Sequence, residues 1–265
     1  MNKKMIQNIF LGIVLLLMYL PILILAVYSF MDSAIIGKSG SFTVKNYVYL
    51  FHSEDLRAMI FGTLILALVV AVVSTILGTL GAIGAFYSSK KLKRPIHLMN
   101  QIPVVNADVV TGFSICVLLI VFFKMDKASY IPLVIGLVSL CSPFVYLSVI
   151  PRLKQMDPQL YEAALDLGCS PFGALRKVVL PQLTSGIVSG FMMSITLTLD
   201  DYFITTYTKP SMFNTISTYV VNATKGAQTD VKTALWALST IIFLVVIFIV
   251  IGMNHTGRKE NDHEI

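Results

Sequence analysis

Six separate stretches of this sequence are apolar and long enough to cross a lipid bilayer as α-helices, each of which takes about 20 residues. They cover residues Ile9–Phe30, Ile60–Tyr87, Gln101–Phe123, Tyr130–Ile150, Leu183–Thr205 and Leu235–Met253. Hydrophobic residues make up 56% of the 265 residues. Charged residues make up only 13%, about half the share in a globular domain. Because a water-soluble fold cannot bury so much apolar surface, the sequence predicts an all-α integral membrane protein with six transmembrane helices.

Basic residues between the apolar runs predict how the chain lies in the membrane. With the N-terminus in the cytoplasm, the cytoplasmic segments hold twelve Lys and Arg residues, and the opposite segments hold eight. The densest group is KKLKR at 90–94. Lys and Arg are enriched on the cytoplasmic side of membrane proteins, so we expect both termini there. The first run is longer than the ~7–15-residue core of a signal peptide, and we interpret it as a retained span.

Two apolar runs carry rows of small residues at a spacing of four, which places each row on one helix face. The rows are Ser74, Gly78 and Ala82 in the second run, and Gly186, Gly190 and Ser194 in the fifth, where the face continues through Thr198, Asp201 and Thr205. Small residues let helix backbones approach closely in a membrane. We therefore expect both faces to contact other helices, or, where the fifth run becomes polar, a water-filled pathway.

The segment between the fourth and fifth runs, residues 151–181, is too polar to span a membrane and too long for a simple turn. The pair Asp157–Pro158 is typical of a helix start, and Gly168 is typical of a helix end. Ser170–Pro171 repeats the start signal. The sequence thus predicts a short helix, a glycine turn and a second short helix over Phe172–Val179 that ends before the following proline.

A pair of short helices outside the membrane is either a plain connector or a docking element for a partner. Ala163 and Ala164 leave a slim surface on the first helix, and Leu160 and Leu167 lie close to the same face. A partner that buries this face is the functional alternative to the connector, and both readings stay open on the residues alone.

The same segment resembles the EAA motif of permease subunits of binding-protein-dependent ABC importers, E-A-A-x3-G-x9-I-x-L-P. The matching residues are Glu162-Ala163-Ala164, Gly168, Val178 and Leu180-Pro181, with Val178 in place of Ile. The resemblance implies a type I ABC importer transmembrane domain whose cytoplasmic coupling helix sits in a groove of an ATP-hydrolysing subunit. It further implies that the residues coupling ATP hydrolysis to transport are Glu162, Ala163, Ala164 and Gly168, with Leu160 and Leu167 beside them.

The family resemblance also implies a set of partners. They are a second, related permease subunit, two copies of an ATP-binding subunit, an extracytoplasmic substrate-binding protein and the lipid of a bacterial cytoplasmic (inner) membrane, with no nucleic acid. The chain has no G-x-x-x-x-G-K-[ST] loop, the motif that cradles nucleotide phosphates. We therefore expect a non-catalytic permease without a cofactor, with ATP and magnesium on the separate ATPase. We interpret residues 1–265 as a single permease domain and 151–181 as its coupling loop.

Three longer stretches resemble the second permease subunit of spermidine/putrescine importers: residues 151–181, LTLDD at 197–201 and NADVVTGFS at 106–114. This resemblance implies a polyamine substrate. Permeases for thiamine, iron, opines, sulfate or molybdate look similar, so another small substrate remains an alternative within the family. An autonomous ion-coupled carrier is the alternative outside it, and the coupling-type loop argues against that class.

Three acidic residues lie within the apolar runs, where no basic residue can pair with them: Asp108 in the third run, and Asp200 and Asp201 in the fifth. A carboxylate in hydrocarbon costs at least about 2 kcal/mol, so such residues usually mark function. We hypothesise that they line a pathway for a cation, with Thr198 and Tyr202 beside them and the Tyr202 ring available for a cation–π contact. The alternatives are solvation at the membrane surface for the pair, and the first turn of a late-starting helix for Asp108.

Overall fold

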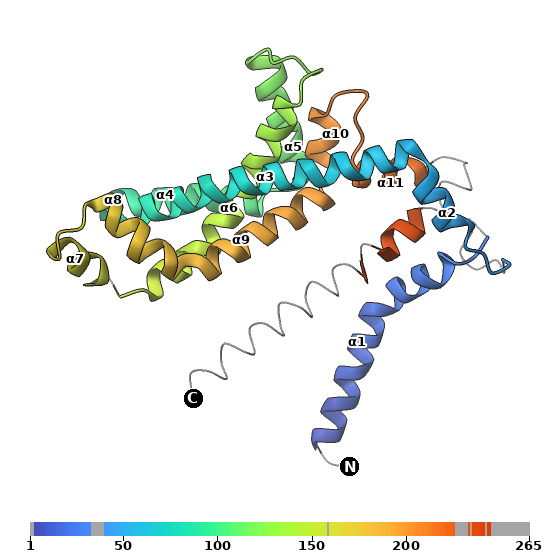
Figure 1. The fold of residues 1–265 in the computed structure, drawn as a ribbon, viewed down its shortest axis with the longest axis horizontal. Helices are drawn as coiled ribbons and strands as arrows, with labels where there is room; N and C mark the ends of the chain where they lie inside the picture. Colours follow the sequence, from blue (N-terminus) through green and yellow to red (C-terminus); the bar gives the residue numbers. More distant parts are fainter. Residues whose placement is uncertain are drawn as a thin grey trace. The chain divides into compact units, whose positions relative to one another are not determined.

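The structure is a computed structural model that describes residues 3–32, 40–157 and 159–225, together with 233, 235–241 and 243–244. Its regular structure in these residues is helical, with one isolated β-bridge between Met31 and Phe42. The helices in Figure 1 are α1 (Lys3–Tyr28), α2 (Lys45–His52), α3 (Glu54–Tyr87), α4 (Lys90–Val105), α5 (Asp108–Cys116), α6 (Ile131–Gln155), α7 (Gln159–Asp166), α8 (Pro171–Ala174), α9 (Leu180–Asp200), α10 (Phe203–Thr208) and α11 (Ile216–Lys225). Two π-helical turns, η1 (Val117–Phe122) and η2 (Leu175–Val179), follow α5 and α8.

Four of these helical segments are long and apolar enough to cross a membrane: Gln7–Tyr28, Glu54–Tyr87, Ile131–Gln155 and Pro171–Asp200. A bent pair, Lys91–Val105 with Asp108–Phe122, brings the number in the described part of the chain to as many as five. The prediction of an all-α multi-pass membrane protein is thereby confirmed. The sixth expected span, 235–253, lies largely outside the described residues.

Contacts divide the chain into two units, which fall within residues 1–58 with 220–265 and within residues 59–219. In the first unit, the Asn46 side-chain amide donates hydrogen bonds to the backbone carbonyls of Ser29 (2.8 Å) and Met31 (3.1 Å). The Phe30 ring stacks against the ring of Phe42 at 5.6 Å between centroids. These contacts fix α2 to the end of α1. The organisation of the whole chain as one domain stays a prediction.

The third apolar run is two helices instead of the single helix expected. Helix α4 ends at Val105, α5 begins at Asp108, and their axes differ by 105°. Asn106 is extended (ψ 148°), and its side-chain amide donates to the hydroxyl of Thr111 at 3.0 Å. Pro103 removes a backbone donor from the last turn of α4, while Asp108 in the first turn of α5 is favoured by the helix dipole. These local effects break the run despite its even hydropathy.

The fifth apolar run is also interrupted, so its predicted polar face ends earlier than expected. Helix α9 stops at Asp200, Asp201 is extended (φ −63°, ψ 123°), and α10 begins at Phe203. Asp201 and Thr205 therefore do not continue the α9 face on which Thr198 lies. The break is stabilised by the Asp201 carboxylate, which accepts hydrogen bonds from the first turn of α10.

The second half of the loop 151–181 continues directly into a membrane helix, where the sequence predicted a separate helix ending before Pro181. Helix α8, turn η2 and helix α9 form one helical segment, Pro171–Asp200. At its π turn, the Leu180 N–H donates to the carbonyl of Leu175, five residues earlier. Pro181 has no N–H to offer, and a π turn is one way in which a helix accommodates such a gap without ending.

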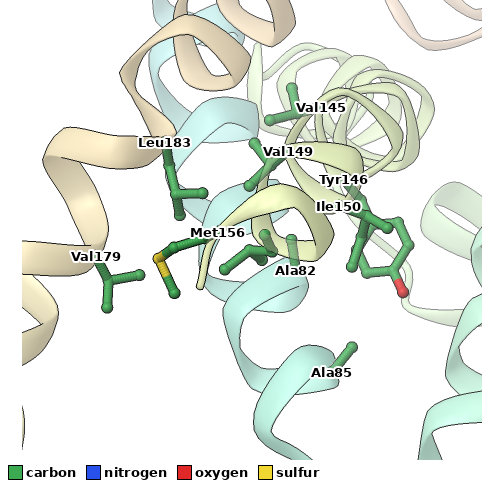
Figure 2. Close-up of a cluster of buried hydrophobic side chains, with 10 residues drawn as sticks. Ala82, Ala85, Val145, Tyr146, Val149, Ile150, Met156, Val179 and Leu183 are labelled. Atoms are coloured by element: carbon green, nitrogen blue, oxygen red, sulfur yellow. The ribbon is translucent and has the colours of Figure 1, made fainter. Parts of the chain in front are cut away.

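Helices α3, α6 and α9 pack together in the second unit, and Figure 2 shows the cluster of buried side chains that joins one end of all three. Its members are Ala82, Ala85, Val145, Tyr146, Val149, Ile150, Leu153, Met156, Val179 and Leu183. The α3 members are alanines, while α6 supplies most of the larger side chains. Burial of these apolar side chains, together with close backbone approach, holds the three helices in contact.

The two rows of small residues lie at these helix contacts, as expected. A methyl group on Gly78 of α3 would lie 2.6 Å from Cβ of Val145. A methyl group on Gly190 of α9 would lie 3.0 Å from Cγ1 of the same Val145, and one on Gly186 would lie 2.9 Å from Cγ of Arg152. The fifth-run face thus contacts α6 of the same chain, and Val145 fits between two glycines from different helices.

Candidate coupling surface and acidic residues

Helix α7 carries the EAA residues, and local hydrogen bonds define both of its ends. At its start, the Asp157 carboxylate accepts a hydrogen bond from the backbone N–H of Gln159 at 2.9 Å. At its end, the Gly168 N–H donates to the carbonyl of Leu165 (2.9 Å) and the Cys169 N–H donates to that of Ala164 (3.0 Å). These two bonds form a Schellman motif, which requires a left-handed residue.

Gly168 provides that left-handed residue, with φ of +85°. No atom lies within 4 Å of the place where a side-chain Cβ would be. The glycine is therefore required for its backbone conformation and not for space. It turns the chain sharply between α7 and α8, whose start is capped by the Ser170 hydroxyl accepting from the Gly173 N–H at 3.1 Å.

The two alanines of the motif face different surroundings, which corrects the expectation that they share one surface. Ala164 is buried and Ala163 is exposed. Leu160 is 41% exposed, and Leu167, which directly follows the last residue of α7, is 87% exposed. The helix is thus attached to its own chain by Ala164 and a half-buried Tyr161, and it presents Leu160, Ala163 and Leu167 outward. Glu162 is exposed as well.

Phe172 belongs to the same exposed apolar set, although its residue type and position did not predict a contact role. It is 75% exposed on α8, which packs next to α7. The available signal was a large aromatic residue directly after a helix start in a segment expected outside the membrane. We define the docking patch as Leu160, Ala163, Leu167 and Phe172. Exposed large apolar side chains gathered on one short segment are typical of a protein–protein contact.

Asp201 is buried, and its carboxylate caps the start of α10. It accepts hydrogen bonds from the Thr205 N–H (2.8 Å), the Thr205 hydroxyl (2.8 Å) and the Ile204 N–H (3.4 Å). These groups satisfy donors that a helix start leaves unpaired. The geometry therefore gives Asp201 a capping role at the start of α10.

Asp200 and Asp108 differ from Asp201 in being exposed. Asp108 lies in the first turn of α5, as the alternative reading of the sequence anticipated, and close enough to Asp201 for their charges to repel. This pairing follows from α5 packing on α10, where a methyl group on Gly112 would lie 3.1 Å from the Ile204 nitrogen. Asp200 ends α9, and its backbone carbonyl accepts from the Ser217 hydroxyl at 3.1 Å.

Thr198 and Tyr202, the neutral members of the predicted pathway, have separate positions. Thr198 is buried, donates to the Ser194 carbonyl at 2.8 Å, and lies 3.6 Å from the Cys141 sulfur of α6. It is therefore part of the contact between α6 and α9. Tyr202 is half-buried, and its ring meets that of Phe203 edge-on at 5.3 Å. Of the three acids, Asp108 and Asp201 thus lie at the starts of α5 and α10, while Asp200 ends α9 and Thr198 belongs to the contact between α6 and α9.

Comparison with known proteins identifies the family. The model of a family described as "Binding-protein-dependent transport system inner membrane component" matches residues 77–256, more than half of the chain. The spermidine/putrescine transport system permease protein PotC of Escherichia coli K12 is 27% identical over 262 residues, covering 98% of this chain and 97% of PotC. The putrescine transport system permease protein PotI of the same strain is 28% identical over 238 residues, covering 85% and 81%.

Solved structures agree with this fold. A chain of a bacterial alginate ABC transporter, crystallised with an alginate pentasaccharide-bound periplasmic protein, superposes with a TM-score of 0.72 at 17% identity. The match covers 93% of this chain and 92% of the other. At that identity the likeness shows the fold alone, which this chain shares with a chain of that ABC transporter. The chain therefore belongs to the family of binding-protein-dependent transport system inner membrane components and is a permease subunit of an ABC importer.

Proposed function

We propose that this permease carries polyamines, spermidine or putrescine, across the cytoplasmic membrane. The observation that carries the proposal is its similarity to PotC along nearly the whole length of both chains. The exposed carboxylates Asp108 and Asp200 support it, because a polyamine carries two to four ammonium groups that need anionic or polar partners throughout their passage. Exposed acids leave such contacts weak enough for release.

We further propose that transport is driven by a separate ATPase that binds the docking patch. The patch lies on the segment of two short helices between membrane spans, and its two largest exposed side chains, Leu167 and Phe172, are 87% and 75% exposed. In this arrangement both termini and the loop 151–181 are cytoplasmic. A second permease subunit, two ATPase copies and an extracytoplasmic binding protein complete the importer.

The proposal is tested by uptake of labelled spermidine and putrescine into cells that lack polyamine importers. The cells express this chain with its genomic neighbours. We expect ATP-dependent uptake that is lost in Glu162→Lys and Gly168→Asp variants which still reach the membrane. An intact complex that hydrolyses ATP but takes up neither polyamine would reject the polyamine assignment and leave the importer family unaffected.

The exposed acid Asp200 gives a second prediction. Asp200→Asn removes one charge while keeping the size of the side chain and the backbone carbonyl that accepts from Ser217. We expect spermidine uptake at low concentration to fall about threefold, the scale of one exposed charge interaction, with unchanged protein abundance. Initial uptake rates against spermidine concentration measure the effect.

Glu54, the first residue of α3, provides the matched control for Asp200, because it is an exposed acid that makes only a long ion pair of 4.0 Å with the exposed Arg57. Glu54→Gln should leave uptake unchanged. If both variants reduce uptake equally, general surface charge and not Asp200 itself attracts the substrate.

A further inference from the structure

The helix with the EAA residues touches α3 through a pair of tyrosine rings. Tyr161 of α7 and Tyr87, the last residue of α3, have ring centroids 5.0 Å apart at an angle of 44°. Tyr161 also packs against the buried cluster that joins α3, α6 and α9. Offset or tilted ring pairs at this distance are favourable beyond their buried area. The contact is thus a specific attachment between two helices far apart in the sequence.

The end of α3 is itself held in place around this ring pair. The Phe86 ring meets Tyr87 edge-on at 5.2 Å. The Lys93 ammonium lies 4.5 Å from the centroid of the Phe86 ring and donates to the Phe86 carbonyl at 3.3 Å. These contacts hold the end of α3 in a fixed conformation around Tyr87. A displacement of the Tyr87 ring would therefore displace the helix end together with the side chain.

The connections of α7 to other helices are of a different kind. Helix α7 follows α6 directly in the chain and leads through α8 and η2 into α9. Any movement of α7 reaches those two helices along the backbone. Movement of α7 reaches α3 through side chains. In the described part of the chain, the Tyr87–Tyr161 pair is the aromatic ring contact between these two helices.

Helix α3 extends from this contact to a loop beside Asp200. It is a 34-residue α-helix without proline, about 50 Å long at 1.5 Å per residue. Near its other end, the Thr63 hydroxyl accepts a hydrogen bond from the Ile216 N–H at 3.1 Å, and a methyl group on Gly62 would lie 2.9 Å from the Phe213 ring. Ser217, next to Ile216, bonds to the carbonyl of Asp200.

The loop 209–217, which contacts this end of α3, is held together by hydrogen bonds of its own. The Lys209 ammonium donates to the Phe213 carbonyl at 2.6 Å and to the Asn214 side-chain carbonyl at 2.9 Å. A displacement of Gly62 and Thr63 would therefore shift the loop 209–217 as a body, together with its contact to Asp200.

We propose that α3 transmits displacements between helix α7, which faces the ATPase, and the loop 209–217 beside Asp200. The Tyr87–Tyr161 ring pair is the contact through which α7 moves α3. The proposal rests on the coupling role assigned above to α7. Both tyrosines act as positioning residues, and neither needs to touch ATPase or substrate. Because a coupling free energy is reciprocal, the same pair would convey binding-protein docking on the outside to the ATPase.

The test uses the complete reconstituted importer with Tyr161→Ala, Tyr87→Ala, the double variant and Tyr161→Phe. Two ratios are measured: ATP hydrolysis with binding protein over basal hydrolysis, and spermidine imported per ATP hydrolysed. We expect unchanged basal hydrolysis, because no side chain of the docking patch is altered and Ala164 still attaches α7 to its own chain. We expect each single alanine variant to lower both ratios about fivefold, within the energy range of one aromatic pair.

Two further results separate transmission from general stability. The double variant should match the single variants instead of multiplying their losses, because both remove one interaction. Tyr161→Phe should restore both ratios to within about twofold, because the ring and not the hydroxyl makes the contact. Phe122→Ala, which removes an exposed ring from another ring pair, is the matched control and should change neither ratio.

Multiplied losses in the double variant, or unchanged ratios in the single variants, would overturn the proposal. Failure of the polyamine assignment is distinguishable from both. A wild-type importer that moves no spermidine, but whose ATP hydrolysis is stimulated by the binding protein, rejects the polyamine substrate alone. The stimulation ratio then still tests the ring pair.

Discussion

Replacing both Leu167 and Phe172 with aspartate is expected to separate this permease from the ATPase that we propose binds the docking patch. The two side chains are 87% and 75% exposed, so their loss leaves the packing of α3, α6 and α9 untouched. Burying an unpaired carboxylate in an apolar contact is costly, and truncating an interface hot spot alone costs 2 kcal/mol or more. We expect polyamine uptake to fall at least about thirtyfold, the equivalent of that energy. Copurification of the ATPase with tagged permease measures the physical cause.

The control for this double variant adds an acid nearby without touching the docking patch. Gln155 is exposed at the end of α6, and Gln155→Asp should retain both ATPase and uptake. An ATPase that stays bound to the Leu167→Asp/Phe172→Asp permease would show that the exposed apolar side chains of α7 and α8 serve another contact.

Replacing Gly78 with alanine is expected to weaken the packing of α3 on α6. Its new methyl group would lie 2.6 Å from Cβ of Val145 and 2.8 Å from the Ser142 carbonyl oxygen, so the helices must move apart. Overpacking of this kind typically costs about 1–3 kcal/mol. We expect the melting temperature of the detergent-solubilised complex to fall about 5 °C, with a matching loss of assembled protein.

Gly84 is the matched control on the same helix, since no atom lies within 4 Å of a methyl group placed there. Alanine is a better helix former than glycine by about 1 kcal/mol, and this gain applies equally to both positions. Gly84→Ala should therefore keep or raise the melting temperature. Equal melting temperatures for Gly78→Ala and Gly84→Ala would contradict the close approach of α3 and α6.

Much of the fold and the family could be predicted from local sequence, because membrane spans and the EAA motif are local signals. The apolar runs specify helices of sufficient length, and Gly168 alone predicts the turn that the Schellman bonds confirm. The breaks at Asn106 and Asp201 could not be predicted in the same way. In each case a polar residue inside an apolar run is compatible with either a continuous or an interrupted helix, and hydrogen bonds to Thr111 and Thr205 decide between them.

The candidate site shows the same limit at the scale of single residues. Ala163 and Ala164 are indistinguishable in sequence, yet one is exposed and one is buried, because the side of α7 that contacts the rest of the chain depends on tertiary packing. Asp200 and Asp201 are likewise neighbours of one type. Only the position of α10, which donates three hydrogen bonds to Asp201, leaves Asp200 as the exposed carboxylate.

The position of Val145 between Gly78 and Gly190 has a consequence for how such permeases evolve. Helices α3, α6 and α9 pack closely at this point. The side-chain volumes at positions 78, 145 and 190 therefore constrain one another during evolution. Among homologous chains, a larger residue at 78 or 190 should occur with a smaller one at 145. The order of substitutions matters too: either glycine is exchanged at lower cost to stability once residue 145 has become smaller.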